Sequence, residues 1–253
     1  MSWAQRILLP MLVFAVLVVV WQAAAGTAPP EARALFPAPG DVWRAFGEIV
    51  ASGMLLTHVS ASLVRFLIGY SLALTAAVPL GFLLGSMPRA WTAFDPLIQV
   101  LRPISPIAWF PLFSLWFGIG ELPAVVIIFM AAFYPALLAT VGGVRAVDPV
   151  YLKVARNFGA GTLATQLGVV LPAALPAIAT GARLAIGAAW IFLVAGEMLG
   201  VQTGLGFLII DARNGLRTDL VIAAIIVIGV LGLVLDRLLR AAEAQVQRAW
   251  GAA

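Results

Sequence analysis

The sequence contains no cysteine, one histidine and few charged residues, since Asp, Glu, Lys and Arg make up 10% of its 253 residues, against about 25% in soluble domains. Without Cys there are no disulfides, no thiol nucleophile and no cysteine-based metal site. The patterns G-x-x-x-x-G-K-[ST] and G-x-S-x-G are also absent, so we expect neither a phosphate-binding loop nor a serine nucleophile. These absences argue against an enzyme, and we expect this chain to bind no metal and no cofactor.

Apolar residues, in contrast, are abundant. Hydrophobic residues make up 63% of the chain, well above the roughly 45–50% of soluble proteins, and they form runs long enough to cross a hydrocarbon core of about 30 Å. The sequence therefore predicts an all-α integral membrane protein embedded in lipid. The net charge of +4 is small, and the charged residues flank the apolar runs. Charges in these positions are typical of topology signals and do not indicate a nucleic-acid partner.

Six apolar runs have the length of membrane-spanning helices. They lie at about residues 7–25, 59–85, 94–117, 122–145, 177–199 and 219–239. The first run could also be a cleaved signal peptide, because Ala23-Ala24-Ala25 resembles a cleavage site. It is longer than a usual signal core and further spans follow it, so we favour an uncleaved helix.

Residues 1–57 form an N-terminal unit that consists of the first span and a loop. Several prolines interrupt regular structure after residue 26, and Asp41 can then cap a helix. In that helix Val42, Phe46 and Ile49 follow a helical stripe, with Val50 beside them. The pattern predicts an amphipathic helix that lies on the membrane surface.

The third span is rich in proline, with Pro96, Pro103, Pro106 and Pro111. It should therefore be kinked or partly unwound. Broken backbone at membrane depth persists where protein or a water-filled cavity covers it. This span is a candidate pore lining, and a kink that serves packing alone is the alternative.

The distribution of basic residues predicts the orientation of the chain. With six spans and a cytoplasmic N-terminus, the C-terminus is cytoplasmic too. Eight basic residues then lie inside and four outside, which agrees with the positive-inside rule. The inner set is Arg6, Arg89, Arg145, Lys153, Arg156, Arg237, Arg240 and Arg248, and the outer set is Arg33, Arg44, Arg213 and Arg217.

Four charged residues lie within spans or at their ends, namely Arg65, Arg102, Arg183 and Glu197. A charge at the centre of a membrane helix costs about 2.5–3.5 kcal/mol on insertion scales, so these side chains should avoid lipid. One interpretation is a polar route for an anionic solute, and we expect Arg102, Trp109, Arg183 and Glu197 beside that translocation path. The alternative is a structural role, such as an ion pair of Arg183 with Glu197 or a position at the membrane boundary.

The interval 148–175 is polar enough to lie outside the membrane. Asp148-Pro149 marks a helix start, because Pro is favoured at the first helical position. Gly159 then ends this helix, since glycine readily adopts the left-handed conformation found at helix C-termini. The helix between them carries an apolar stripe of Val150, Val154 and Phe158, with Tyr151 and Ala155 beside it, and a polar side of Lys153, Arg156 and Asn157.

A second short helix is expected to resume near Thr162, with Leu163, Leu167 and Val170 on one face. Leu171-Pro172 and Pro176 should end it before the next span, because proline interrupts a helix. Two such apolar helices outside the membrane need a surface against which to pack. A helix lying on the lipid surface is the alternative.

This interval resembles the EAA loop of binding-protein-dependent ATP-binding cassette (ABC) importer permeases. The pattern of that loop is EAA, three residues, Gly, nine residues, a branched apolar residue and then Leu-Pro. It is matched here by Lys153-Val154-Ala155, Gly159, Val169 and Leu171-Pro172, with Lys153 where the family commonly has Glu. Further segments are similar to the nitrate, sulfonate and taurine branch, namely LFPAPGDVW (35–43), LRPISPIAWFPLFSLWFGIGE (101–121), GVRAVDP (143–149), AGEMLG (195–200), GLGFLI (204–209) and RTDLV (217–221).

The resemblance implies the type I importer transmembrane fold over residues 58–239, with cytoplasmic coupling helices in the loop 148–175 and a cytoplasmic tail, 240–253. It implies a permease of the bacterial inner membrane that moves a small anionic solute, such as a sulfonate, taurine or nitrate, into the cytoplasm. A secondary transporter or channel for a small anion is the alternative.

The resemblance also implies partners. A periplasmic or lipid-anchored solute-binding protein would deliver the solute, and a second permease copy would complete the path. Two cytoplasmic ATPase subunits, which carry the ATP and Mg²⁺, would dock on the coupling residues. These residues are Tyr151, Lys153, Val154, Ala155, Arg156, Asn157, Phe158, Gly159, Leu163 and Pro172.

Overall fold

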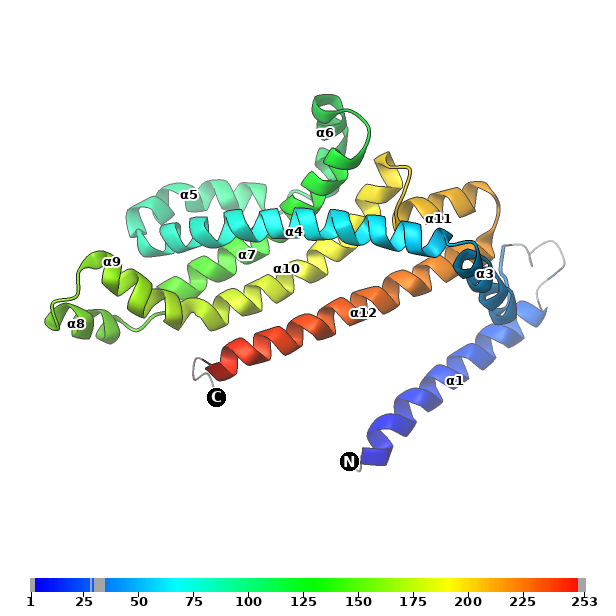
Figure 1. Ribbon diagram of the computed structural model, residues 1–253, viewed down its shortest axis with the longest axis horizontal. Coiled ribbons are helices and arrows are strands. Elements are labelled where there is room, and N and C mark those ends of the chain that lie inside the picture. The colour runs from blue at the N-terminus through cyan, green and yellow to red at the C-terminus, as the bar shows by residue number, and fades with distance from the viewer. Residues whose placement is uncertain (1–2, 28, 30–34, 250–253) are drawn as a thin grey trace.

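The computed structural model describes residues 3–27, 29 and 35–249, and the regular elements in that part of the chain are all helical (Figure 1). They are α1 (Trp3–Thr27), α3 (Pro39–Ala51), α4 (Met54–Ser86), α5 (Pro88–Leu101), the 3-10 turn η1 (Pro106–Trp109), α6 (Phe110–Phe117), α7 (Glu121–Arg145), α8 (Pro149–Asn157), α9 (Thr162–Thr165), the π-helical turn η2 (Gln166–Val170), α10 (Leu171–Gly200), α11 (Leu205–Asn214) and α12 (Thr218–Ala249).

The prediction of about six spans is confirmed. Five helices in the described part of the chain are long and apolar enough to cross a membrane, at Leu8–Thr27, Met54–Ser86, Glu121–Arg145, Thr162–Gly200 and Thr218–Arg248. Pro88–Leu101 and Pro106–Phe117 make a sixth span when the two helices, which are bent by 82° relative to each other, are counted as one. Pro103 and Pro106 lie at this bend and lack the N–H groups that would continue α5. The predicted interruption of the third span is therefore confirmed as well.

Helix α7 is the centre of the bundle, because it packs between α4 and α10. On α4 a small residue recurs at every fourth position, which keeps the series on one face; the series is Gly69, Ala73, Ala77, Gly81 and Gly85. A Cβ added to Gly81 would lie 2.8 Å from the Cβ of Thr140 in α7. The two backbones therefore approach closely, as in the small-residue contacts that join membrane helices.

Helix α10 begins earlier than the sequence suggested. The turns α9 and η2 run into α10 as one apolar helix from Thr162 to Gly200, so the expectation that Leu171-Pro172 and Pro176 end a separate short helix is wrong. In a regular α-helix the ring of Pro172 would clash with a carbonyl of the preceding turn. Here the Leu171 N–H bonds to the Gln166 carbonyl, five residues back, and this wider π turn accommodates the proline.

Helix α3 confirms the amphipathic helix that was predicted after the first span. Its Val42, Ala45 and Ile49 are buried, and Ile49 packs with Leu208 of α11 and Ala224 of α12. The helix is therefore attached to the bundle by its apolar stripe. Arg33 and residues 250–253 of the predicted tail lie outside the described residues.

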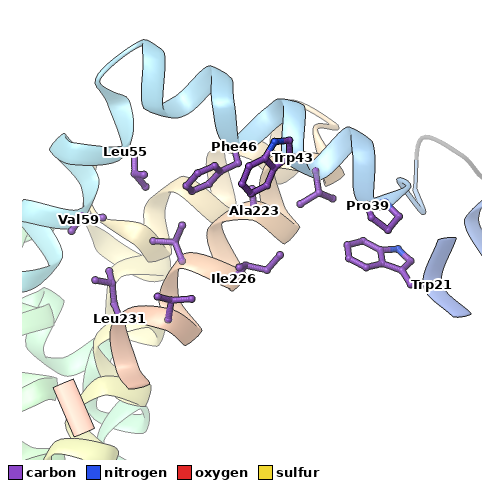
Figure 2. Close-up of a pocket in the computed structure, with 12 residues that line it drawn as sticks. Trp21, Pro39, Trp43, Phe46, Leu55, Val59, Ala223, Ile226 and Leu231 are labelled. Atoms are coloured by element: carbon purple, nitrogen blue, oxygen red, sulfur yellow. The ribbon is translucent and has the colours of Figure 1, made fainter. Parts of the chain in front are cut away.

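Helix α1 stands apart from the other spans (Figure 1), and most of its large apolar side chains are exposed. The Trp21 indole N–H donates a hydrogen bond of 3.1 Å to the Pro37 carbonyl. Beside this contact, apolar side chains of α1, α3, α4 and α12 line a groove of about 510 Å³ (Figure 2). Such surfaces fit lipid or another apolar helix, as expected of an integral membrane protein.

The close approach of α4 and α7 can be tested with a pair of Gly→Leu substitutions. We expect Gly81→Leu to lower the melting temperature of the purified protein in detergent, because overpacking costs about 1–3 kcal/mol and each kcal/mol corresponds to about 2–4 °C in a protein of this size. Gly142→Leu on α7 is the matched control, since nothing lies within 4 Å of an added Cβ there. Equal melting temperatures for the two variants would contradict this packing.

Candidate functional site

Helix α8 has a defined beginning and a defined end. Asp148 caps its first turn, with Oδ1 accepting a hydrogen bond of 2.8 Å from a backbone N–H. At the other end Gly159 has a φ of +77°. The Gly159 N–H bonds to the Arg156 carbonyl, and the Ala160 N–H bonds to the Ala155 carbonyl. This pair of bonds is the Schellman motif, so the predicted glycine stop is confirmed.

The elbow, which we define as α8, α9 and the residues between them, lies at one end of the bundle (Figure 1). Phe158 is 88% exposed and Leu163 is 72% exposed. Every residue of α8 is at least partly exposed, including Tyr151, Lys153, Val154, Ala155, Arg156 and Asn157. The elbow thus presents an apolar surface with positive charge beside it.

The elbow is nevertheless attached to the spans. Leu152 of α8 packs against a buried cluster that contains Val144 of α7 and Ala174 of α10. The Ser86 hydroxyl donates a hydrogen bond of 2.9 Å to the side-chain oxygen of Gln166, which links the end of α4 to η2. Pro172, the last of the predicted coupling residues, lies in the first turn of α10. The elbow is therefore packed against the ends of α4, α7 and α10.

A buried ion-pair network joins the beginning of α4 to the end of α10. These helix ends lie at the other end of the bundle from the elbow (Figure 1). Arg65 of α4 is 3% exposed and Glu197 of α10 is 1% exposed. Arg65 Nη1 lies 2.6 Å from Glu197 Oε1, and Arg65 Nη2 lies 2.7 Å from Oε1 of Glu121, the first residue of α7. The same guanidinium donates to the carbonyl of Thr203 at 2.9 Å. One arginine thus joins α4, α7, α10 and the loop after α10.

The carboxylate of Glu197 is fully occupied by donors. Ser62 Oγ lies 2.8 and 2.9 Å from its two oxygens, and the Gly206 N–H donates to Oε2 at 2.9 Å. The Leu205 N–H in turn donates to Ser62 Oγ at 2.8 Å. A Cβ at position 204 would overlap the carboxylate, and the φ of Gly204 is +110°. Glycine at this turn therefore lets the backbone pass close to Glu197, so that the Gly206 N–H reaches the carboxylate.

Sequence reasoning identified Arg65 and Glu197 as charges within spans, but it missed their partners Ser62, Glu121 and Thr203. It also missed His58, whose Nδ1 accepts a hydrogen bond of 3.0 Å from the Gly204 N–H. A signal was available, because positions 58, 62 and 65 are spaced by four and three residues and so share one helix face. A polar stripe at that spacing within an apolar span indicates a buried polar contact.

Arg183 belongs to a separate ion-pair network, with α12. Its Nε lies 2.6 Å from Glu243 Oε2, and its Nη1 lies 4.0 Å from Asp236 Oδ1. The suggested ion pair of Arg183 with Glu197 is therefore wrong. The two residues are 14 positions apart (183 to 197) on one helix, which separates them by about 21 Å along its axis.

Arg102 and Trp109 lie on either side of the bend in the third span. Arg102 follows α5 and Trp109 ends η1. Arg102 lines a cavity of about 350 Å³ together with residues of α7 and α10. The indole nitrogen of Trp109 is buried and has no hydrogen-bond partner in the described part of the chain. That Arg102, Trp109, Arg183 and Glu197 all lie beside one path stays a prediction.

The elbow and the network around Arg65 differ in character, because the elbow is exposed and the pair of Arg65 with Glu197 is buried. Within residues 3–27, 29 and 35–249, no group of three or more His, Asp or Glu side chains could hold a metal ion. The buried carboxylate Glu197 is held by a counter-charge and by donors, which leaves it no position for a substrate.

The chain belongs to the family of binding-protein-dependent transport system inner membrane components, whose profile matches residues 77–248. It is therefore a permease subunit of an ABC importer and a multi-pass protein of the inner membrane. Subunits of this family are not enzymes themselves. A secondary transporter or a channel is not favoured.

The relatives place the chain in the predicted branch. It is 36% identical to the putative aliphatic sulfonates transport permease protein SsuC of Bacillus subtilis, over 96% of this chain and 86% of that protein. It is 37% identical to the taurine transport system permease protein TauC of Escherichia coli, over 75% and 69%, and 40% identical to the nitrate import permease protein NrtB of Leptolyngbya laminosa, over 73% and 66%.

The fold is also found in solved structures. An inward-facing crystal structure of the MetNI methionine ABC transporter contains a chain with a TM-score of 0.65 and 18% identity to this one, and the match covers 78% of this chain and 96% of that chain. The predicted type I importer fold is thereby confirmed.

The network around Arg65 should control stability. Arg65→Met leaves Glu197 buried without its counter-charge, and breaking a buried pair in this way costs about 3–5 kcal/mol. We expect a large fall in melting temperature in detergent, and partial recovery in Arg65→Met/Glu197→Gln, which removes the charge but keeps an acceptor. Arg44→Met is the control, because its pair with Asp41 is exposed and such pairs contribute at most about 1 kcal/mol. The interpretation fails if Arg65→Met and Arg44→Met unfold at the same temperature.

Proposed function

We propose that this permease moves a small anion into the cytoplasm and that the elbow is the surface through which two ATPase subunits drive it. The observation that carries the proposal is the elbow itself, a helix capped at both ends, with exposed apolar side chains, that is attached to three spans. Contiguous exposed apolar surface outside a membrane is typical of a protein interface. The motif that resembles the EAA loop of importer permeases, Lys153 to Pro172, overlaps the elbow and continues into α10.

The proposed ATPase contact is formed by Tyr151, Lys153, Val154, Ala155, Arg156, Asn157, Phe158, Gly159, Leu163 and Pro172. Tyr151 and Phe158 supply exposed aromatic side chains, and large anchors of this kind carry much of the binding energy of protein interfaces. Lys153 and Arg156 add positive charge at the rim, which favours acidic partner groups. Because Lys153 stands where the family commonly has Glu, an ionic contact at this position would have the opposite sign.

The proposed ATPase contact also determines the orientation that we propose for the chain in the membrane. The elbow, both termini and the tail 240–253 lie in the cytoplasm, and residues 58–239 form the transmembrane domain. Helices α3 and α11 then lie at the periplasmic end of the bundle, where a solute-binding protein would dock. The excess of basic residues on the elbow side of the spans supports this orientation.

Two copies of the chain would enclose the path, and ATP and Mg²⁺ would bind to the ATPase subunits and not to this chain. ATP binding would draw the two ATPase subunits together, and the two elbows with them. Since the elbow is attached to α4, α7 and α10, this movement would tilt the spans and open the path to the periplasm. Hydrolysis would return the spans to the inward-facing state.

The substrate class follows from what the relatives share. Their names refer to aliphatic sulfonates, taurine and nitrate, and each of these solutes carries a negatively charged oxygen group. We infer that the solute of this permease is likewise a small oxyanion. The solute-binding protein would set most of the selectivity among such anions.

The proposal is tested by uptake into liposomes that contain this chain and its cognate ATPase, with the binding protein outside. We expect ATP-dependent uptake of at least one of radiolabelled taurine, ethanesulfonate and nitrate, and none with a non-hydrolysable ATP analogue. Uptake that persists without ATP would indicate a carrier or channel. A chain that does not co-purify with the ATPase would contradict the proposed contact.

The glycine of the elbow offers a sharper test of coupling. Gly159→Val places a β-branched residue at a φ of +77°, a left-handed conformation that costs about 1–2 kcal/mol, so the end of α8 should rearrange. We expect solute-stimulated ATP hydrolysis by the assembled transporter to fall about tenfold or more while the variant still inserts. Gly161→Val is the matched control, because Gly161 has a φ of −67° and open space at its Cβ. Equal rates in the two variants would refute the role of Gly159.

A further inference from the structure

A cavity of about 350 Å³ lies against the middle of α7. Its walls include Met130, Tyr134 and Leu138 of α7 and Phe192 of α10, and Arg102 is the charged residue that lines it. Because α7 spans residues 121–145, positions 130–138 lie near the midpoint of that span. The cavity is therefore at membrane depth.

Arg102 differs from the other two arginines that the sequence placed within spans. Arg65 is paired with Glu197 and Glu121, and Arg183 is paired with Glu243. The guanidinium of Arg102 has neither an ion pair nor a hydrogen bond with any residue that the structure describes. Arg102 is exposed at the surface of this chain, where it lines the cavity. An unpaired charge at membrane depth is costly in lipid, so its guanidinium requires water or a bound anion.

The bend in the third span explains how the fold brings Arg102 to this depth. Helix α5 begins at Pro88 and ends at Leu101, and its 14 residues extend for about 21 Å. Arg102 follows immediately, and the chain then turns by 82° into the next half of the span. Irregular backbone at membrane depth is found where it lines a water-filled cavity or is covered by protein. The bend and the cavity therefore occur together.

The lining determines what the cavity can bind. A planar guanidinium donates two parallel hydrogen bonds to carboxylate, sulfonate or similar oxyanions. The phenolic O–H of Tyr134 can donate a further bond, and Met130, Leu138 and Phe192 offer an apolar wall for a short carbon chain. Positive charge without a neighbouring carboxylate disfavours cations. The volume is at the lower end of the range for small-molecule sites.

We propose that Arg102 and this cavity form an anion subsite in the translocation path, suited to a small organic oxyanion with an apolar part, such as an alkanesulfonate or a short carboxylate. The proposal rests on the proposed function, since it assumes that the permease moves anions. The proposal goes further than that function, because it assigns Arg102 as the charged residue that binds the solute within the spans. Neither Arg65 nor Arg183 is available for that role, because both are engaged by carboxylates.

The absence of cysteine from the sequence allows a direct test of this charge. Met130→Cys places a thiol in the cavity wall of the otherwise cysteine-free transporter, assembled with its ATPase in membranes. Its rate of modification is measured with sulfonatoethyl methanethiosulfonate, which is an anionic sulfonate, and with trimethylammonioethyl methanethiosulfonate, which is a cation. Each rate is divided by the rate for a free thiol in solution. The ratio of the two normalised rates reports the local potential, because the fraction of thiolate cancels.

We expect the normalised ratio to favour the anionic reagent and to fall about tenfold when Arg102→Gln is added, as a unit charge within about 10 Å predicts. Arg89→Gln is the matched control, because it removes the same charge at the distant end of α5 and should leave the ratio unchanged. If Arg102→Gln does not accumulate, Leu138→Cys in the unaltered background should show the same preference for the anionic reagent.

An unchanged ratio after Arg102→Gln would overturn the proposal. So would a thiol at position 130 that reacts with neither reagent, or a ratio at position 138 that shows no preference for the anion. Co-purification of the ATPase is measured on the same samples. Loss of that association would contradict the proposed function, whereas a missing anion preference with the association intact would contradict the subsite alone.

Discussion

The close packing of α7 between α4 and α10 is the constraint on which the rest of the structure depends. Within lipid, apolar side chains gain little by contacting one another instead of acyl chains, so helices associate where small residues let their backbones approach. The series from Gly69 to Gly85 supplies that approach on α4. Because the three helices are held at this distance, Arg65 reaches carboxylates from both α7 and α10, and the elbow at the other end rests on the same helices.

Features with a strong local cause could be predicted from the sequence. The spans follow from the length of the apolar runs, and the bend in the third span follows from prolines that cannot donate backbone hydrogen bonds. The end of α8 follows from Gly159, because the conformation required there favours glycine over residues with a side chain. In each case a few neighbouring residues determine the outcome, whatever packs around them.

The partners of the charged residues could not be predicted in this way. Arg65 and Glu197 are 132 positions apart in the sequence, and their contact depends on how three helices are placed relative to one another. The continuity of the helix at Leu171-Pro172 was missed for a different reason. Proline is a reliable stop for a regular α-helix, but a π turn moves the clashing carbonyl away, and no simple residue pattern signals such a turn. The exposed side chains of the elbow were predicted as a stripe, while their accessibility required the three-dimensional arrangement.

The unbroken helix from Thr162 to Gly200 has a mechanical consequence. Its 39 residues extend for about 58 Å, which is longer than the hydrocarbon core is thick. It starts in the elbow and ends beside Glu197, so a single helix joins the elbow to the Arg65 network at the opposite end of the bundle. If its packing against α7 holds the middle of this helix in place, a displacement of α9 would move the loop after α10 in the opposite direction. Movements at the two ends of the bundle would then be coupled by the stiffness of a single helix. No series of side-chain rearrangements between the two ends would be needed.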